Sequence, residues 1–273
     1  MSVSAESFGF VAELVRDQSA IQLHPGKEYL VESRLLPLAR ARGLSGPSAV
    51  DNYVRDVRRS QDRGELTRVI EAMTTNETSW FRDSEPFQNL RNVVLPDVRK
   101  RNSGQLRIWS AACSTGQEPY SIAMTLLERE ERNFSILATD LSNAVLSRAV
   151  KGEYSQLEIN RGLPAPMLVR YFEREGAGWV VKPELKQRIS FVQHNLLRPT
   201  PAGGYFDIVF LRNVLIYFDT ATKRDILTRL RRAMRPGGYL ILGAAESTMG
   251  IDDAWERIPA SRGPVYRVPG GTS

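Results

Sequence analysis

Apolar residues follow a helical period in the first quarter of the chain and a mixed strand and helix pattern after it. In the first part they recur three or four positions apart. Four segments with this spacing predict amphipathic helices, at residues 5–19, 27–44, 49–60 and 65–76. Short polar breaks, such as the one that begins at His24, separate them. The pattern predicts an all-helical N-terminal domain, which we bound at residues 1–75, and a linker over residues 76–90.

A strand, a turn of small residues and a helix are predicted next. Leu106, Ile108 and Trp109 are typical of a strand, and apolar residues repeat at helical spacing up to Leu127. The residues between them, 111–116, carry little side-chain bulk, so a ligand can lie against the backbone there. An adenosine-type cofactor fits such a turn, and we assign residues 91–273 to a cofactor-binding domain.

The glycine pattern of this turn is not that of a nicotinamide or flavin site, because Gly116 is its only glycine. Asp140 ends the second predicted strand, 24 residues after Gly116. An acidic residue at that distance can accept hydrogen bonds from the ribose hydroxyls of a nucleoside. The alternative is that Asp140 serves only as a helix N-cap.

The alternation of strands and helices is interrupted between Gly152 and Ile189. A helix-like piece at residues 165–172 is followed by a β-like piece at 178–182. We predict a small inserted β element, at about residues 153–188, and a return strand after it. Asn195 and Leu196 leave that return strand, where contacts to a nucleobase are usual.

A buried strand and a loop are predicted in the segment from Tyr205. The strand is almost continuously apolar, which is typical of a central parallel strand. Arg212, Asn213 and Tyr217 then follow at its carboxyl end, where open α/β sheets place ligands, although a purely structural Tyr217 is an alternative. The next helix should end at the Pro-Gly-Gly that begins at Pro236, which leads into another strand. Two short strands near the C-terminus, around residues 255–258 and 265–268, should close the sheet edge.

The linker carries an unusual cluster of side chains suited to a ligand. Its members are Asn76, Thr78, Trp80, Phe81 and Arg82. A segment between two domains is a favoured place for residues that face a cleft. The alternative is an N-cap and hydrophobic staple for the next helix.

Charge and composition narrow the choice of function. The chain has 273 residues and a net charge of +6, with the positive excess in residues 82–273. Its single cysteine, Cys113, excludes an internal disulfide, and two histidines argue against a metal site. No apolar run approaches a membrane span and no signal peptide precedes the first helix, so we expect a cytoplasmic protein.

A basic stripe could form on the second predicted helix. Arg34, Arg40 and Arg42 lie at spacings that can share one face. The stripe is either a docking surface or a solvated face. Pro37 lies among them and should bend or interrupt the helix.

Six segments of the chain together resemble the chemotaxis receptor methyltransferases, the CheR-type enzymes of the class I S-adenosylmethionine-dependent methyltransferases. The segments are MTTNETSWFRD at 73, SAACSTGQEPYS at 110, ATDLS at 138, NLL at 195, LRNVLIYFD at 211 and RPGGYLILGAAES at 235. The first and fifth are specific to that family. The resemblance implies a doubly wound, Rossmann-like α/β fold with a mostly parallel seven-stranded sheet. It also implies an inserted antiparallel β-subdomain and a separate all-α N-terminal domain that docks on the receptor.

The resemblance also assigns residues to roles. Positions that match cofactor contacts are Asn76, Thr78, Arg82, Glu118, Asp140, Asn195, Leu196, Asn213 and Val214. Arg82 and Tyr217 match the residues that face the transferred methyl group. Arg34, Arg40 and Arg42 match the basic helix that meets the receptor. The short turn at residues 175–178 favours an enzyme that needs no receptor tether.

The implied reaction moves a methyl group from S-adenosylmethionine to a receptor glutamate, with S-adenosylhomocysteine as product. A glutamate carboxylate is ionised near neutral pH, so no general base is required. Arg82 and Tyr217 would then position the carboxylate. The expected partner is the cytoplasmic helical bundle of a chemoreceptor, with no nucleic acid and no membrane insertion. We expect a monomer and leave open a regulator at the N-terminal helices.

Two other functions remain open on the sequence. A nucleic-acid methyltransferase would use the same cofactor domain, but base methylation at an exocyclic amine commonly uses an Asn/Asp-Pro-Pro-aromatic motif. Asn213 is followed here by Val-Leu-Ile. A non-catalytic module that binds the cofactor for signalling is the second alternative.

Overall fold

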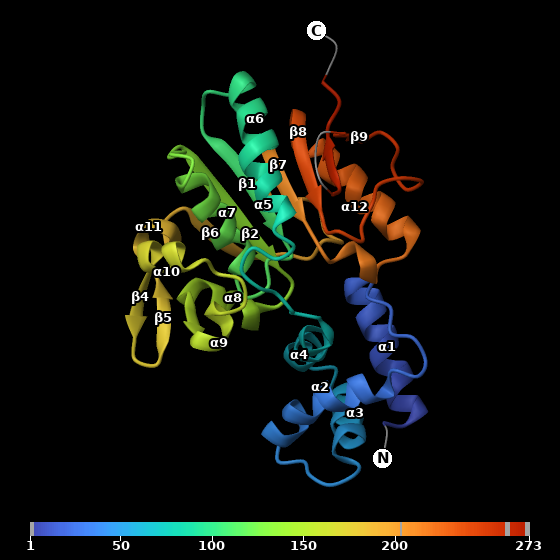
Figure 1. Ribbon diagram of the computed structural model, residues 1–273. Helices are drawn as coiled ribbons and strands as arrows, with labels where there is room; N and C mark the ends of the chain where they lie inside the picture. Colours follow the sequence, from blue (N-terminus) through green and yellow to red (C-terminus); the bar gives the residue numbers. More distant parts are fainter. Residues whose placement is uncertain (1–2, 203, 260–262, 271–273) are drawn as a thin grey trace. The chain divides into compact units, whose positions relative to one another are not determined.

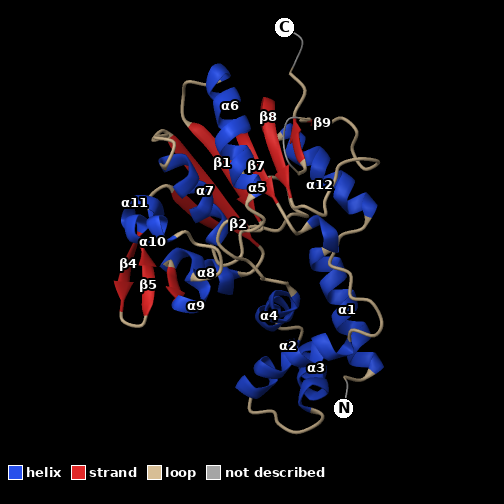
Figure 2. Ribbon diagram, in the orientation of Figure 1, coloured by secondary structure: helices blue, strands red, loops and turns tan. Residues whose placement is uncertain are grey.

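The chain divides into two compact units in a computed structural model that describes residues 3–202, 204–259 and 263–270. The first unit comprises the chain up to Thr75 together with Tyr217–Asp219, and the second runs from Asn76 to Ile216 and continues from Thr220. The N-terminal helices of the first unit are drawn from blue to teal in Figure 1, and Figure 2 separates helices from strands in the same view.

The first unit is helical, as the apolar spacing predicts. Its helices are α1 (Ala5–Ser19), α2 (Glu28–Ala41), α3 (Ala49–Ser60) and α4 (Arg63–Met73). Asp62 caps α4, because its side chain accepts hydrogen bonds from the backbone N–H groups of Gly64 and Glu65. Buried aliphatic residues from all four helices form one core, among them Val11, Val31, Val54 and Val69.

The ends of two helices differ from the prediction. Pro37 lies inside α2 and does not interrupt it, since the helix continues to Ala41. The helix predicted to reach Asn76 stops at Met73, where Thr74 takes an extended conformation. The chain therefore leaves the helical pattern just before the cluster of linker residues.

The second unit is built on a seven-stranded, mostly parallel sheet, which confirms the predicted fold class. Its strands, in spatial order, are β6 (Ile189–Gln193), β2 (Phe134–Asp140), β1 (Leu106–Ala111), β7 (Phe206–Leu211), β8 (Met234–Leu242), β10 (Val265–Arg267) and β9 (Glu256–Arg257). The first five strands are parallel, and β10 pairs antiparallel with both β8 and β9. The chain order reverses between β1 and β7, so their carboxyl ends form the crevice where such sheets bind ligands.

Helices flank this sheet and bury its strands. They are α5 (Glu85–Asn89), the π-helix η1 (Leu90–Val94), α6 (Leu95–Arg101), α7 (Gln117–Leu127), α8 (Asn143–Lys151), the 3₁₀-helix η2 (Leu215–Tyr217) and α12 (Thr220–Arg232). Every residue of β7 is buried, as expected for a strand covered on both faces. Helix α7 connects β1 to β2 on one side of the switch point, and α12 connects β7 to β8 on the other side. Because crossovers between parallel strands are right-handed, the two helices lie on opposite faces of the sheet.

The Pro-Gly-Gly segment has a different role from the one predicted. The preceding helix, α12, already ends at Arg232, and Pro236 to Gly238 lie inside β8. Register is lost there, because Phe206 pairs with Met234 while Ile208 pairs with Tyr239. The two glycines therefore allow a β-bulge and do not terminate the helix.

A small antiparallel sheet is inserted between β2 and β6, as predicted. It consists of β3 (Glu153–Ser155), β5 (Gly178–Val181) and β4 (Phe172–Glu175), in that spatial order. Three short helices accompany it: α9 (Gln156–Ile159), α10 (Ala165–Tyr171) and α11 (Pro183–Lys186). The strand β3, α9 and α11 were not predicted, because each is only three or four residues long.

Candidate active site

The turn between β1 and α7 has a backbone suited to a close ligand. Ala112, Ser114 and Gly116 all have positive φ, at 65°, 50° and 96°. A Cβ on Gly116 would lie 2.9 Å from the Cβ of Ala149, so only glycine fits where α7 begins beside α8. The turn is therefore packed tightly against α8 at Gly116, and its side chains are small.

Tyr154 of the inserted sheet braces this turn. Its hydroxyl donates a hydrogen bond to the backbone carbonyl of Thr115 at 2.7 Å, and the residue is 3% exposed. Burial raises the pKa of Tyr154 well above its ordinary value, so it remains a donor. The inserted sheet thus supports the predicted cofactor turn, a contact that the sequence does not reveal.

Asp140 lies at the carboxyl end of β2, as predicted, and is buried. One carboxylate oxygen accepts the backbone N–H of Ser114 at 2.8 Å, and the other accepts that of Ser142 at 3.0 Å. Asp140 therefore orders the turn from the strand end where α/β folds of this kind place the acceptor for a ribose.

Cys113 is buried in the turn and has no nucleophilic character. Burial raises the pKa of its thiol well above the ordinary value, and the nearby carboxylates of Asp140 and Glu118 raise it further. The thiol therefore stays protonated, in keeping with a packing role.

The loop after β6 presents Asn195 and Leu196. The Asn195 side chain accepts the backbone N–H of Leu197 at 2.9 Å, and the Leu196 carbonyl accepts a hydrogen bond from Arg229 at 2.7 Å. His194 precedes them, and burial followed by the charge of Arg229 lowers the pKa of its imidazole. The histidine is therefore neutral near pH 7 and adds no charge beside this loop.

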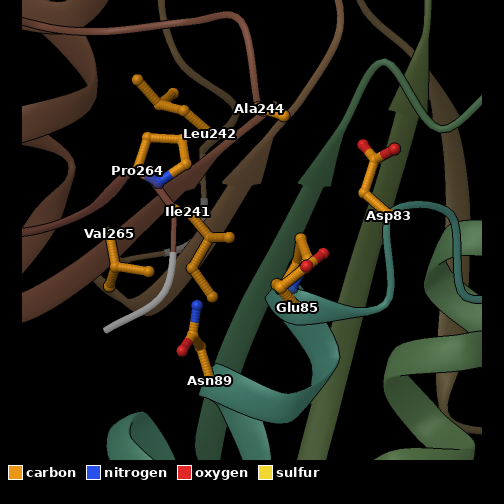
Figure 3. Close-up of a pocket in the computed structure, with 10 residues that line it drawn as sticks. Asp83, Glu85, Asn89, Ile241, Leu242, Ala244, Pro264 and Val265 are labelled. Carbon is orange, nitrogen blue, oxygen red and sulfur yellow. The ribbon is translucent and has the colours of Figure 1, made fainter. Parts of the chain in front are cut away.

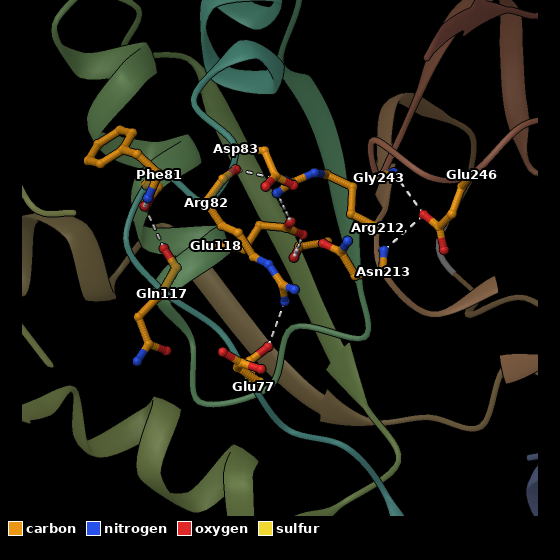
Figure 4. A network of polar contacts seen from close by, with 12 residues as sticks. Glu77, Phe81, Arg82, Asp83, Gln117, Glu118, Arg212, Asn213, Gly243 and Glu246 are labelled. Atoms are coloured by element: carbon orange, nitrogen blue, oxygen red, sulfur yellow. Dashed lines mark hydrogen bonds and ion pairs between the residues drawn. The ribbon is translucent and has the colours of Figure 1, made fainter. Parts of the chain in front are cut away.

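The loop after β7 is organised by Glu246, which the sequence analysis missed. This buried carboxylate accepts four backbone N–H groups, from Asn213, Val214, Leu215 and Gly243, at 2.7–2.9 Å. Two of these bonds are drawn in Figure 4. Asn213 also has a left-handed backbone, with φ of 57°. The carboxylate thus fixes the two loop residues predicted to contact the cofactor, and an acid directly after an apolar strand was the available signal.

The segment that carries Arg82 is attached to the second unit along its length. The Asn76 carbonyl accepts a hydrogen bond from the Ser114 hydroxyl at 2.7 Å, and the Phe81 N–H donates to the Ser121 hydroxyl at 3.1 Å. Between them, the Trp80 N–H donates to the Arg161 carbonyl at 3.1 Å. The segment is therefore an ordered part of the second unit.

Trp80 corrects one expectation about this segment. Its ring is 1% exposed and packs edge-on against Tyr154 and Phe172, with centroids 4.8 and 5.3 Å away. The indole is an internal anchor and does not face a ligand. Phe81 likewise packs against the core, beside Phe87 at 5.2 Å.

Arg82 and Glu118 meet through a polar network at the edge of the sheet (Figure 4). The Arg82 guanidinium donates to the Glu77 carbonyl at 2.8 Å. Glu118, at the start of α7, accepts the Ser110 hydroxyl and a guanidinium N–H of Arg212, each at 2.8 Å. The predicted cofactor residue Glu118 is thus already oriented by two neighbours.

Cavities lie beside this network within the second unit. One, of about 420 Å³, is lined by the predicted residues Asn76 and Thr78 together with Thr115 and Gln117 of the turn. A smaller one, of about 190 Å³, is lined by Asp83, Glu85 and Asn89 on one side and by Ile241, Leu242, Ala244, Gly263, Pro264 and Val265 on the other (Figure 3). Residues that precede Arg82 in the sequence therefore line one cavity, and residues that follow it line the other.

The predicted docking residues belong to the first unit. Arg34 is turned inward, because its guanidinium donates to the carbonyls of Met73 and Thr74 at 2.7 and 3.0 Å. Arg42 pairs with the buried Glu65 at 2.8 Å. Arg40 is exposed on α2. Tyr217 ends η2 and is half-buried, and it is grouped with the first unit.

The described residues hold neither a metal cluster nor a membrane-spanning helix. In residues 3–202, 204–259 and 263–270, no group of three or more histidine, cysteine or acidic side chains could hold a metal ion. None of the helices in this described part is long and apolar enough to cross a membrane.

Comparison with known proteins decides the family. The model of the CheR methyltransferase S-adenosylmethionine-binding domain matches residues 76–263, and the model of the CheR methyltransferase all-alpha domain matches residues 6–74. The chain belongs to the CheR methyltransferase family. It is therefore an S-adenosylmethionine-dependent methyltransferase, which confirms the predicted cofactor.

Curated relatives agree over almost the full length. A chemotaxis protein methyltransferase of Pseudomonas aeruginosa is 44% identical and covers 98% of this chain and all of the relative. Chemotaxis protein methyltransferase Cher2 of Pseudomonas putida is 45% identical, covering 91% of this chain and 92% of the relative. A chemotaxis protein methyltransferase of Escherichia coli is 35% identical, covering 90% and 86%.

The residues present suit the cofactor of this family. A nucleoside needs an acceptor for its ribose and a surface without bulk, and Asp140 and the turn around Gly116 supply them. A buried carboxylate at the carboxyl end of β2, bonded to the backbone of the small-residue turn, is the observation that supports this fit.

Proposed function

We propose that this enzyme transfers a methyl group from S-adenosylmethionine to glutamate side chains on the cytoplasmic helical bundle of chemoreceptors. The products are glutamyl methyl esters and S-adenosylhomocysteine, and the role is sensory adaptation. Similarity to chemotaxis protein methyltransferases over 98% of the chain carries this proposal. The enzyme acts in the cytoplasm as a monomer.

The cofactor, when bound, supplies a methyl group on a positively charged sulfur. The protein must then align the acceptor carboxylate with that methyl group and exclude water around it. The acceptor is already ionised near neutral pH, so no base is needed. This suits a site in which burial keeps His194 neutral and Cys113 protonated.

Arg82 and Tyr217 are the residues that we assign to the acceptor. The Arg82 guanidinium can offer two parallel donors to a carboxylate, and it now donates to the backbone carbonyl of Glu77. Tyr217 can add one hydrogen bond. Tight pairing would weaken the nucleophile, so both act by orientation.

Cofactor contacts are assigned to residues around the switch point. Asp140 accepts from the ribose, and Glu118 faces the same crevice. The remaining proposed contacts come from the linker and from the loops after β6 and β7: Asn76, Thr78, Arg82, Asn195, Leu196, Asn213 and Val214.

Receptor docking is assigned to the first unit and centres on α2. Arg40 is exposed there and Arg42 lies at the end of the helix, half-exposed beside Glu65. Arg34 supports the surface indirectly, because it holds α2 to the end of α4.

The decisive experiment measures the product of the reaction. Labelled S-adenosylmethionine is incubated with chemoreceptor-containing membranes, and alkali is then used to release volatile methanol from methyl esters. We expect alkali-labile label that is lost in Arg82→Ala. Label that resists alkali would indicate nitrogen methylation, and label in added RNA would indicate a nucleic-acid substrate.

Asp140→Ala tests the cofactor site directly. The substitution removes the proposed ribose acceptor and two hydrogen bonds that order the turn. We expect cofactor affinity to fall by more than about tenfold, the equivalent of about 1.4 kcal/mol. Calorimetric titration with S-adenosylhomocysteine measures it, and an unchanged affinity would remove Asp140 from the ribose role.

A further inference from the structure

Arg212 is a buried cation at the carboxyl end of β7 for which the reaction provides no obvious use. Its side chain is 2% exposed. One terminal nitrogen donates to Glu118 at 2.8 Å, and the other donates to the Arg82 carbonyl at 2.7 Å and to the Asp83 carboxylate at 2.9 Å. The guanidinium also lies over the ring of Phe87 at 5.7 Å. A buried charge this well paired is costly to replace.

The segment that Arg212 holds has an unfavourable backbone. Phe81, Asp83 and Ser84 have φ of 48°, 65° and 39°, in a region that residues other than glycine rarely adopt. Each such residue costs on the order of 1 kcal/mol or more and persists only when its surroundings fix it. Arg82 lies in the middle of this strained run. The hydrogen bonds from Arg212 to Arg82 and Asp83 therefore stabilise this unfavourable backbone conformation.

The same guanidinium links two parts of the proposed site. Glu118 belongs to the start of α7, and Arg82 belongs to the linker, and Arg212 contacts both (Figure 4). A planar fork with fixed donor directions can make these contacts at once, whereas a lysine ammonium at the same place has one nitrogen on a flexible stem. Arg212 contacts only the main chain of Arg82, and the Arg82 side chain donates separately to the Glu77 carbonyl, so the two guanidinium groups do not compete for one position.

We propose that Arg212 is a positioning residue for methyl transfer: it holds the main chain at Arg82 in register with Glu118, so that the Arg82 side chain meets the acceptor carboxylate. This inference rests on the proposed function for the role of Arg82. It adds that the orientation of Arg82 is set from a strand end 130 residues away in the sequence.

Arg212→Lys is the primary test, because it retains the charge and removes the fork. We expect kcat to fall roughly 100-fold, the scale expected when a catalytic group is displaced by about 1 Å. The KM for S-adenosylmethionine should change much less. Arg99→Lys is the matched control, since Arg99 also bridges a carboxylate and several carbonyls, at Glu131, Asn102 and Gly104, but lies away from the site. The control should keep the wild-type kcat.

A double-mutant cycle separates positioning from plain stability. In an Arg82→Lys background the Arg212→Lys substitution should cost little further rate, because the group being positioned is already impaired. Full additivity of the two losses in kcat would overturn the inference. Asp83→Ala supplies a second cycle with Arg82→Lys if the Arg212 variant does not fold, since Asp83 is a partly exposed arm of the same clamp.

Hydrogen exchange decides the inference even if the acceptor is not a glutamate. In the wild type the peptide that spans residues 77–87 should be protected, and Arg212→Lys should raise its exchange rate while the rest of the sheet is unchanged. Arg99→Lys should leave that peptide protected. Equal protection of the peptide in wild type and Arg212→Lys would refute the positioning role. Wild-type enzyme that forms no alkali-labile ester would refute the proposed function alone.

Discussion

Glu246→Gln tests how the loop after β7 is held. One Glu246 oxygen accepts the N–H groups of Val214 and Leu215, and the other accepts those of Asn213 and Gly243. Glutamine keeps one oxygen and places an amide NH₂ where the other was. Two backbone donors then face a donor, although the side chain has almost the same shape.

The cost follows from these two orphaned groups. A buried N–H without an acceptor costs about 1–3 kcal/mol, so the pair amounts to roughly 2–6 kcal/mol. The loop can avoid part of this cost by moving, but Asn213 and Val214 then leave the positions that we assign to the cofactor. We therefore expect both a lower free energy of unfolding and an affinity for S-adenosylhomocysteine that is at least about tenfold weaker, or about 1.4 kcal/mol.

Denaturant unfolding and calorimetric titration measure the two effects. Glu256→Gln is the matched control, because it makes the same chemical change in a partly exposed ion pair with Arg267. Such a pair contributes only about 0–1 kcal/mol, and cofactor affinity should be unaffected. If Glu246→Gln unfolds and binds like this control, the four hydrogen bonds do not organise the loop and our reasoning is wrong.

Two further substitutions probe other parts of the chain. Gly162→Ala should lower methyl incorporation sharply. The new Cβ would clash with the Trp80 carbonyl, and the φ of 101° at this position is unfavourable for alanine. Wild-type turnover would show that the linker segment can shift without loss of activity. Glu65→Gln should cost about 1–3 kcal/mol at pH 7, because it removes the charge that pairs with Arg42 and leaves one oxygen where Tyr53 and Arg42 now use two. Burial alone would raise the Glu65 pKa, but the Tyr53 hydroxyl, Arg42 and Arg68 outweigh burial and lower it. Because the folded state thus favours the ionised carboxylate, the wild type should lose this stability as the pH falls below the ordinary glutamate pKa of about 4.3. Unfolding at pH 7 and pH 4 should show a smaller drop for Glu65→Gln, and an equal drop would contradict the assignment.

Periodicity was enough to predict most of the scaffold. The four N-terminal helices, the alternation around β1, β2 and β7, and the two short C-terminal strands follow directly from apolar spacing. Errors arose where a local signal has two meanings. Pro-Gly-Gly can end a helix or open a bulge, and only the register between β7 and β8 distinguishes them. Pro37 is tolerated inside α2 although proline usually ends a helix.

The candidate site was predicted less completely than the scaffold. Its spacing from Gly116 identifies Asp140, whose position at the end of β2 the structure bears out. Trp80 was expected to face a ligand, but a large aromatic next to polar residues fits a buried anchor equally well in sequence. The partners of Glu246 in the loop after β7 and those of Arg212 could not be foreseen, because they are 31–33 and 94–130 residues away.

The attachment of the Arg82 segment sets an order for the assembly of the enzyme during synthesis. The segment leaves the ribosome before the residues that anchor it. Phe81 is bonded to Ser121, 40 residues later, and Trp80 to Arg161, 81 residues later. Arg82 is bonded to Arg212, 130 residues later. Contacts between such distant residues form only after the intervening chain has folded. The residue proposed to guide the methyl group is therefore fixed in place only after β7 has been synthesised and has joined the sheet.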